Sequence, residues 1–305
     1  KMKPEYMVMG IVFILQTTVG ILVNSSVLLH YLVPGFTGKG LKLKTLIVKH
    51  LTLANSLSII SRGIPQIMAE FGMKYFLDDI GCKLVLYLYR VSRGVSLYTT
   101  CLLSCFQATI ISSNTTKWMK FKHKAIKYMG PSCSFSWPMN LLLNVMILVT
   151  VTSSSNRRNA TKKLTYGYCS ASVSGTIATP LYMLLLSFTD VLCLSLMSWA
   201  SVFMLSILHR HKRQVQYIHG AQHSLRVSPE ARATQTILIL ACTFVTFYSI
   251  SSIMVLYSAL FGNPGLWVIN IISVLETCYP IFCSFVLISN NSSASRLYLH
   301  CWWKH

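Results

Sequence analysis

Charged residues are scarce in this sequence. Only 11% of its 305 residues are Asp, Glu, Lys or Arg, and the acidic ones number 7. Soluble domains usually carry about a quarter charged residues. This deficit, together with a hydrophobic content of 53% and a positive mean hydropathy, excludes an ordinary soluble domain. It indicates a protein that crosses a membrane several times.

Because acidic residues are so few, the formal net charge is +20. A charge of this size can attract nucleic acid. Here, however, the Lys and Arg residues lie in short segments between long apolar runs, which is where membrane proteins carry them. We therefore expect a lipid bilayer as a partner, and no nucleic acid.

Signatures of catalysis and of transport are missing as well. The sequence has no H-E-x-x-H motif and no paired acid and base, so we expect neither an enzyme nor a cofactor. His219 and His223 are four residues apart in a basic loop but lack a third ligand, so we expect no metal site. A transporter or channel remains the alternative function, although no internal repeat or pair of broken helices supports it. A flux assay in proteoliposomes would separate the two.

Seven apolar runs are each long enough to cross a hydrocarbon layer of roughly 30 Å, which takes about 20 helical residues. They lack the alternation of barrel strands, and lipid offers no partners to open backbone groups, so helices are expected. The sequence thus predicts an all-α membrane protein, a single seven-helix domain over residues 1–305. The predicted spans are Tyr6–Leu32, Thr45–Ala69, Lys83–Ile111, Tyr128–Val149, Thr179–Leu208, Thr236–Leu260 and Leu266–Ile288.

The third run carries two arginines, Arg90 and Arg93. An arginine at the centre of a membrane helix costs roughly 2.5–3.5 kcal/mol on insertion scales. Residues three apart share a helix face, and that face must look into protein or a watery cavity. We therefore expect this helix at the centre of the bundle.

Two other runs depart from a simple apolar helix. The second is the least apolar, so we expect its insertion to depend on its neighbours. The fourth contains Pro131 and Pro138, and we expect bends there.

The distribution of basic residues predicts the orientation. If the N-terminus lies outside and the C-terminus inside, most Lys and Arg fall in the inner segments, in agreement with the positive-inside tendency. The longest inner loop, His209–Arg232, is strongly basic. It fits a solvated face near anionic lipid, and it fits equally a docking surface for a cytosolic partner.

Cysteines and a glycosylation sequon agree with this orientation. Of ten cysteines, only Cys82 and Cys169 face the oxidising side. This indicates one disulfide, with two free thiols as the alternative. The sequon at Asn159 lies in the second outer loop, where it is accessible to the glycosylation machinery.

Several longer stretches match a known family. They are HLTLAN (50–55), SRGIPQ (61–66), GCKLVLYLYRVSRGVSLYTTCLLSCFQA (81–108), LLSFTDVLCLSLMSWAS (185–201), HRHKRQVQYIH (209–219), SPEARATQTIL (228–238) and a proline at 280 followed by SFVLIS (284–289). Together they resemble the vomeronasal type-1 receptors, seven-helix pheromone receptors that couple to G proteins.

The resemblance implies a Cys82–Cys169 disulfide, a glycan at Asn159 and a small pheromone-like ligand. It also implies signalling through an inhibitory-type heterotrimeric G protein at the plasma membrane, in sensory neurons of the vomeronasal organ. The Asp-Arg-Tyr motif common in rhodopsin-like receptors is replaced by Phe106-Gln107-Ala108. The activation switch therefore stays unassigned.

Ionisable residues inside the spans are the candidates for a ligand site. For the arginines and Asp190 we favour internal ion pairing, with an outward-opening pocket for an acidic or hydrogen-bond-accepting ligand as the alternative. Glu276 stands where the family usually has no charge. We expect Glu276→Ala to change ligand preference and leave surface expression intact. The candidate pocket residues are Tyr87, Arg90, Arg93, Tyr98, Phe188, Asp190 and Glu276, and the structural polar residues are Asn24, Asn55 and Arg62.

The inner loops are the expected contact with the G protein. We expect a ligand between the outer helix halves to favour an arrangement of the bundle in which the inner face opens. Residues 112–127 and 209–232 would then engage the G protein. The contact candidates are Lys117, Lys120, Lys122, Arg210, Lys212 and Arg213.

Overall fold

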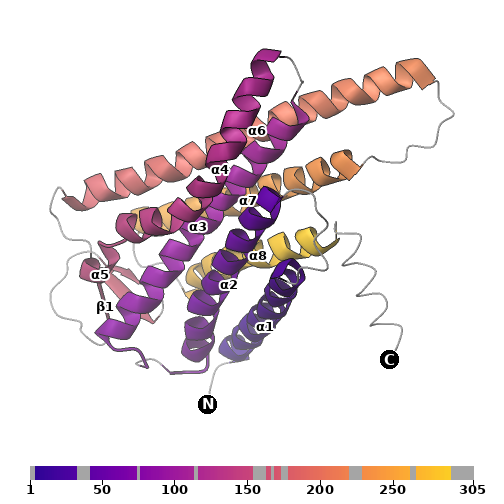
Figure 1. Cartoon of the computed structure of the whole chain (residues 1–305). Coiled ribbons are helices and arrows are strands. Elements are labelled where there is room, and N and C mark those ends of the chain that lie inside the picture. The colour runs from indigo at the N-terminus through magenta and orange to yellow at the C-terminus, as the bar shows by residue number, and fades with distance from the viewer. Residues whose placement is uncertain are drawn as a thin grey trace.

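The computed structural model describes residues 4–32, 42–73, 76–112, 116–153, 163–165, 168–172, 178–219, 229–261 and 266–289. These residues are almost entirely helical (Figure 1). The long helices are α1 (Pro4–Leu32), α2 (Lys42–Glu70), α3 (Asp79–Ile111), α4 (Thr116–Leu143), α6 (Ala178–His219), α7 (Pro229–Phe261) and α8 (Leu266–Ser289). The short elements are helix α5 (Ile147–Thr150) and strands β1 (Val151–Ser153), β2 (Lys163–Thr165) and β3 (Cys169–Ser172).

Helix α3 runs through the middle of the bundle (Figure 1) and packs against α2, α4, α6 and α7. It begins after Asp78, whose side chain accepts a hydrogen bond from the backbone N–H of Gly81 at 2.7 Å. Such a cap satisfies one of the backbone donors that the first turn leaves open. Most of the helix is buried from Cys82 to Ala108. The central position expected from its two arginines is therefore confirmed.

Six helices of the described chain are long and apolar enough to cross a membrane: 6–32, 79–111, 122–149, 187–210, 234–254 and 267–288. Helix α2 falls outside this set, as the low hydropathy of its sequence predicts. It nevertheless takes a place in the bundle against α1, α3 and α8. Its polar residues Asn55, Arg62 and Gln66 are buried, so neighbouring helices, and not lipid, surround them.

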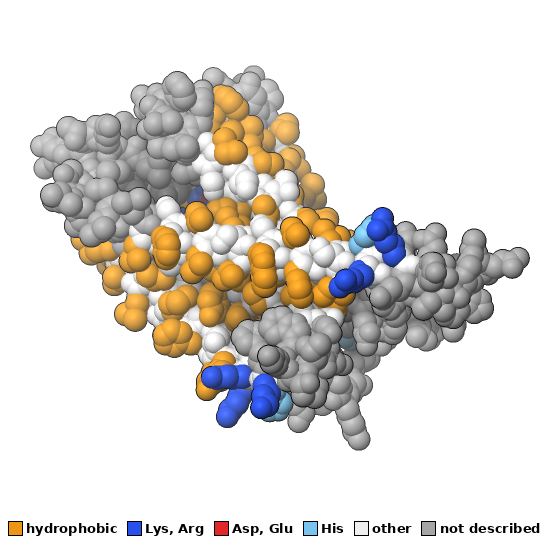
Figure 2. All heavy atoms as spheres, turned by 90° about the horizontal axis from the view of Figure 1, so that it is seen from above, with side chains coloured by type: hydrophobic (Ala, Val, Ile, Leu, Met, Phe, Trp, Pro, Cys, Tyr) orange, Lys and Arg blue, Asp and Glu red, His pale blue; other side chains and the backbone are white. Residues whose placement is uncertain are grey.

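The surface of the bundle is broadly apolar, and Lys and Arg side chains gather at the edge of the apolar area (Figure 2). Large side chains such as Leu22, Phe135, Trp199 and Trp267 are exposed on it. Monomeric soluble proteins rarely expose apolar patches of this extent. This surface is the one that lipid would cover.

Several helices extend beyond their predicted spans, and α7 begins at Pro229 where the sequence predicted Thr236. Helix α4 begins at Thr116 where the sequence predicted Tyr128, and α6 continues to His219 where it predicted an end at Leu208. Hydropathy marks only the apolar part of a helix, whereas Lys, Arg and Gln are good helix formers and carry it on into water. Helix α4 also runs without interruption through both of its prolines.

Close packing of α3 on α4 depends on Gly94. A Cβ at this position would clash with the side-chain amide of Asn140, which is buried and donates to the carbonyl of Ser136 at 2.8 Å. Small residues let membrane helices approach each other closely. We expect Gly94→Ala to lower the free energy of unfolding by about 1–3 kcal/mol, the usual cost of overpacking.

Thermal unfolding of the purified protein measures this effect, and Gly130→Ala is the matched control. At Gly130 the nearest atom, on Leu43, would lie 3.5 Å from the added Cβ, which is an ordinary contact. Equal destabilisation by the two substitutions would contradict the role given to Gly94.

Candidate functional site

The first turns of α3 are tied to a small sheet. Cys82 on α3 and Cys169 at the start of β3 form a disulfide, the pair that the resemblance implies. Strand β3 lies between β1 and β2 and is antiparallel to both. Tyr168 precedes Cys169 and is buried, and Arg62 of α2 donates a hydrogen bond to its hydroxyl at 3.4 Å. The disulfide therefore anchors a loop tyrosine against a buried arginine.

Glu276 of α8 is shared by two arginines. Its Oε1 lies 2.8 Å from Nη1 of Arg93 on α3, and its Oε2 lies 3.3 Å from Nη2 of Arg62. Arg62 also donates to Oγ of Ser273 at 2.9 Å, and its guanidinium lies 5.4 Å from the ring centroid of Tyr89. Arg62, Arg93 and Glu276, called the charge cluster below, thus join α2, α3 and α8. This arrangement is the internal ion pairing that we expected for these arginines from the sequence.

A second polar contact joins α6 to α7. Tyr248 of α7 donates a hydrogen bond to the carboxylate of Asp190 on α6. The guanidinium of Arg93 lies 4.8 Å from the ring centroid of Tyr248, within the range of a cation–π contact. Asp190 therefore reaches the charge cluster through Tyr248.

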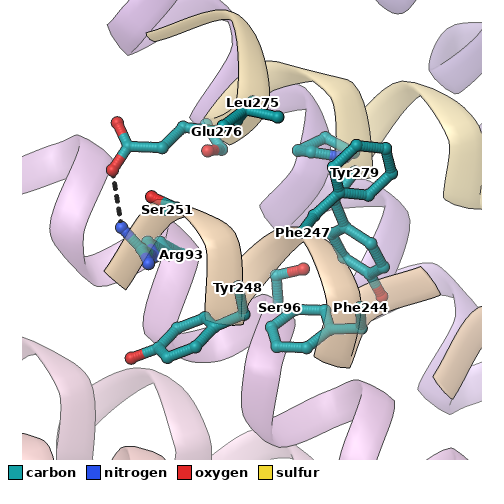
Figure 3. A pocket seen from close by; sticks show the side chains of 11 residues that line it. Arg93, Ser96, Phe244, Phe247, Tyr248, Ser251, Leu275, Glu276 and Tyr279 are labelled. Atoms are coloured by element: carbon teal, nitrogen blue, oxygen red, sulfur yellow. Dashed lines mark hydrogen bonds and ion pairs between the residues drawn. The ribbon is translucent and has the colours of Figure 1, made fainter. Parts of the chain in front are cut away.

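A pocket lies beside the Arg93–Glu276 ion pair (Figure 3). Its walls come from α2, α3, α7 and α8. Phe244 of α7 and Tyr279 of α8 pack edge to face on its aromatic side, with ring centroids 4.3 Å apart. The pocket thus has an aromatic part and, opposite it, an ionic part, a combination typical of small-molecule sites.

Ser251 of α7 also lines this pocket. Its side chain is only 2% exposed, and its hydroxyl has no hydrogen-bond partner among the described residues. Figure 3 shows the hydroxyl on the same side of the pocket as the Arg93–Glu276 pair. Buried polar atoms are nearly always paired with protein or water. A hydroxyl in this position is therefore available to a molecule in the pocket.

The predicted pocket residues separate into two groups. Arg93 and Glu276 line the pocket, and Asp190 contacts one of its lining residues, Tyr248. The others do not line this pocket, because the rotation of a helix about its axis is not readable from the sequence. Tyr87 donates a hydrogen bond to the carbonyl of Leu141 at 2.8 Å, next to α4.

Three further candidates are absent from the pocket lining. Phe188 is 65% exposed on the outside of the bundle, so it faces the surroundings and not the interior. Arg90 and Tyr98 are half-buried. Both lie on α3. Arg90 shares a face with Arg93 but is about one turn nearer the start of the helix, whereas Tyr98 is five residues beyond Arg93 and lies on another face.

Sequence reasoning missed the contribution of α7. Phe244, Phe247, Tyr248 and Ser251 all line the pocket. None is charged, so nothing distinguished them within an apolar run. Their positions follow the i, i+3, i+4, i+7 spacing of one helix face, and this signal would have found them once Tyr248 was known to face inward.

The polar residues expected to be structural are buried and hydrogen-bonded. Asn24 of α1 donates to the carbonyl of Pro280 on α8 at 3.3 Å, and its Oδ1 accepts from Ser284 at 2.7 Å. Asn55 of α2 accepts from Ser96 of α3 at 2.7 Å. Each of these residues links two helices, and Arg62 belongs to the charge cluster.

The basic candidates for partner contact lie at the ends of α4 and α6. Lys120, Arg210 and Arg213 are exposed. Lys122 instead donates to the carbonyl of Ile110 at the end of α3, at 2.9 Å. The side chains of Lys117 and Lys212 lie outside the described residues, and so do Asn159 and His223. Among the residues that the structure does describe, no group of His, Cys, Asp and Glu could hold a metal ion.

The sequence is similar to those of known proteins over nearly the whole chain. Residues 7–299 match the family described as "Vomeronasal organ pheromone receptor family". Human vomeronasal type-1 receptor 4 is 46% identical over 97% of this chain and 98% of its own length, and human vomeronasal type-1 receptor 3 is 45% identical over 96% and 94%. The zebrafish (Danio rerio) olfactory receptor class A-like protein 1 is 30% identical over 92% and 89%.

Fold and site together define a multi-pass helical membrane protein with a pocket inside its bundle. The chain belongs to the vomeronasal type-1 receptor family, a family of seven-helix chemosensory receptors of the G-protein-coupled type. It is accordingly a protein of the plasma membrane, in a family of receptors and not of enzymes.

Proposed function

We propose that this receptor binds a small pheromone-like ligand in the pocket between α3, α7 and α8 and then activates an inhibitory-type heterotrimeric G protein. The observation that carries the proposal is the buried, unpartnered hydroxyl of Ser251 beside the Arg93–Glu276 pair, among the described residues. A ligand that accepts or donates a hydrogen bond there, with an apolar body against Phe244 and Tyr279, would fit both parts of the pocket.

The proposed orientation has the N-terminus outside and the C-terminus inside. The excess of basic residues in the inner segments supports it. The disulfide supports it as well, because such bonds persist on the oxidising side of a membrane. In this orientation Asn159 lies outside and carries the glycan, and the exposed basic ends of α4 and α6 lie inside. The tissue we propose is the sensory epithelium of the vomeronasal organ.

The pocket is well placed to influence the arrangement of the helices. It is lined by α2, α3, α7 and α8, and Tyr248 links it to α6 through Asp190. A ligand that binds one arrangement of these helices more tightly shifts the population toward it. At the other end of α3, Gln107 donates to Thr234 of α7 at 3.2 Å. A movement of α7 relative to α3 would therefore alter the inner face.

Ligand-dependent nucleotide exchange tests the proposal. The purified receptor is reconstituted with an inhibitory-type G protein and exposed to a panel of small molecules, and binding is measured in parallel. We expect at least one ligand to bind and to accelerate exchange. Binding without accelerated exchange would reject the signalling role, and flux of the ligand across sealed vesicles would favour a transporter.

Ser251→Ala tests the site itself. We expect it to weaken the potency of such a ligand by about 2–10-fold, the range that one net hydrogen bond supplies, at unchanged maximal response. Ser252→Ala is the matched control, since Ser252 is the next residue of the same helix and is exposed. If the ligand were equally potent on the two variants, we would conclude that it does not bind in this pocket.

A further inference from the structure

One continuous stripe of α4 is exposed from Lys120 to Leu142. It comprises Lys120, Lys124, Lys127, Pro131, Phe135, Pro138 and Leu142, each exposed. Their spacing of three or four residues places them on one side of a helix with 3.6 residues per turn. The opposite side carries Met129, Cys133, Ser136 and Asn140, which are buried against the bundle.

The stripe has a cationic part and an apolar part, which meet between Lys127 and Tyr128. Up to Lys127 its members are cationic, and from Tyr128 onward the exposed face is apolar, with Tyr128, Phe135 and Leu142 being 57%, 63% and 75% exposed. The apolar part belongs in the acyl chains, because none of the described protein covers it. The lysines then stand directly above it, at the level where the acyl chains meet the headgroups.

The dimensions agree with this placement. At 1.5 Å per residue, Lys120 lies about 10 Å beyond Lys127 along the helix axis. The polar headgroup layer on each side of a bilayer is roughly 5–8 Å thick. Lys127, Lys124 and Lys120 therefore cross that layer one after another on a single face.

We propose that this face of α4 binds an anionic phospholipid of the cytoplasmic leaflet, with acyl chains along the apolar part and the headgroup phosphate between Lys124 and Lys127. Polybasic segments beside a membrane helix attract such lipids. Lys122 points to the other side of the helix and holds the end of α3 through Ile110. A bound lipid would thus sit near the end of α3, next to the proposed G-protein surface.

The inference depends on the proposed function only for the side of the membrane, and its test needs neither ligand nor G protein. The purified full-length receptor in neutral detergent is titrated with dioctanoyl phosphatidylinositol 4,5-bisphosphate, and bound lipid is counted by native mass spectrometry. The variant is Lys124→Gln with Lys127→Gln. The matched control is Arg210→Gln with Arg213→Gln, which removes the same charge from the exposed end of α6.

We expect the α4 variant to bind the lipid about 25-fold more weakly, since one Lys at an anionic surface contributes about a factor of five. The α6 control should change by less than about twofold, and Lys124→Arg with Lys127→Arg should keep the affinity. Because all these side chains are exposed, unfolding temperatures should be unchanged. Phosphatidylserine should show the same preference for α4.

Two results would overturn the proposal. If the α4 and α6 variants lost lipid affinity equally, the binding would be explained by general attraction between opposite charges and not by a site on α4. Binding of soluble inositol 1,4,5-trisphosphate as tight as that of the lipid would show that the apolar part of the stripe has no role. Neither result depends on ligand-dependent nucleotide exchange. The lipid-binding proposal can therefore be rejected without rejecting the proposed function.

Discussion

Glu276→Gln is expected to remove most of the receptor from the cell surface. The side chains of Arg62 and Glu276 are only 2% and 7% exposed, and the Glu276 carboxylate contacts both Arg62 and Arg93. Without the carboxylate, two guanidinium groups remain in the interior with no counter-charge from α8. Breaking a buried ion pair in this way costs about 3–5 kcal/mol. Proteins are stable by only about 5–15 kcal/mol, so the folded fraction should fall sharply.

Surface labelling of an N-terminal tag and thermal unfolding of the purified protein measure this loss. The informative control is the triple variant Arg62→Met, Arg93→Met, Glu276→Gln, which removes the buried charges together. Apolar replacement of a complete buried ion cluster is often neutral or stabilising. The triple variant should therefore regain surface expression and lose ligand response. Normal expression of the single variant would contradict the role given to the cluster.

This expectation revises the one made from the sequence for Glu276→Ala. The sequence marked Glu276 as a charge at an unusual position, which pointed to ligand selection and intact expression. The two ion pairs give the same carboxylate a structural role. A change in ligand preference therefore has to be read from the surviving surface fraction, or in the triple variant.

The fold was readable from the sequence because membrane spans obey a simple constraint. Runs such as Tyr6–Leu32 have no alternative to a helix in lipid, and α1 ends at Leu32 as predicted. The arginines of α3 indicated its central place by the cost of exposing them to lipid. Helix ends in water follow no such rule, so the extensions of α4 to Thr116 and of α6 to His219 were missed.

The site was readable only where charge marked it. Arg93 and Glu276 stood out because charges in a membrane must pair or line a cavity. Aromatic and hydroxyl residues carry no such mark, since Phe and Ser are common on every face of a membrane helix. The rotation of each helix about its axis determines which of its side chains face the pocket. Phe247 lines the pocket, whereas Phe188, equally apolar, faces outward.

Loss of the Cys82–Cys169 disulfide is the second large effect we expect. The bond closes a segment with a sequence separation of 87 residues. Removing a native disulfide of this kind typically costs about 2–5 kcal/mol, which in the chain-entropy model reflects the greater freedom of the unfolded chain. We therefore expect Cys82→Ser and Cys169→Ser each to lower the unfolding temperature and surface expression strongly, and to the same extent, because either one breaks the same bond.

The disulfide also holds Tyr168 against Arg62, so the surviving receptors should respond less to ligand. Tyr168→Phe separates the two effects, since it keeps the disulfide and removes only the hydroxyl that contacts Arg62. It should lower the unfolding temperature far less than either cysteine variant. Cys242→Ser controls for loss of a thiol, because Cys242 is an exposed free cysteine of α7. If Cys242→Ser destabilised the receptor as much as Cys82→Ser, the effect would come from the serine and not from the broken bond.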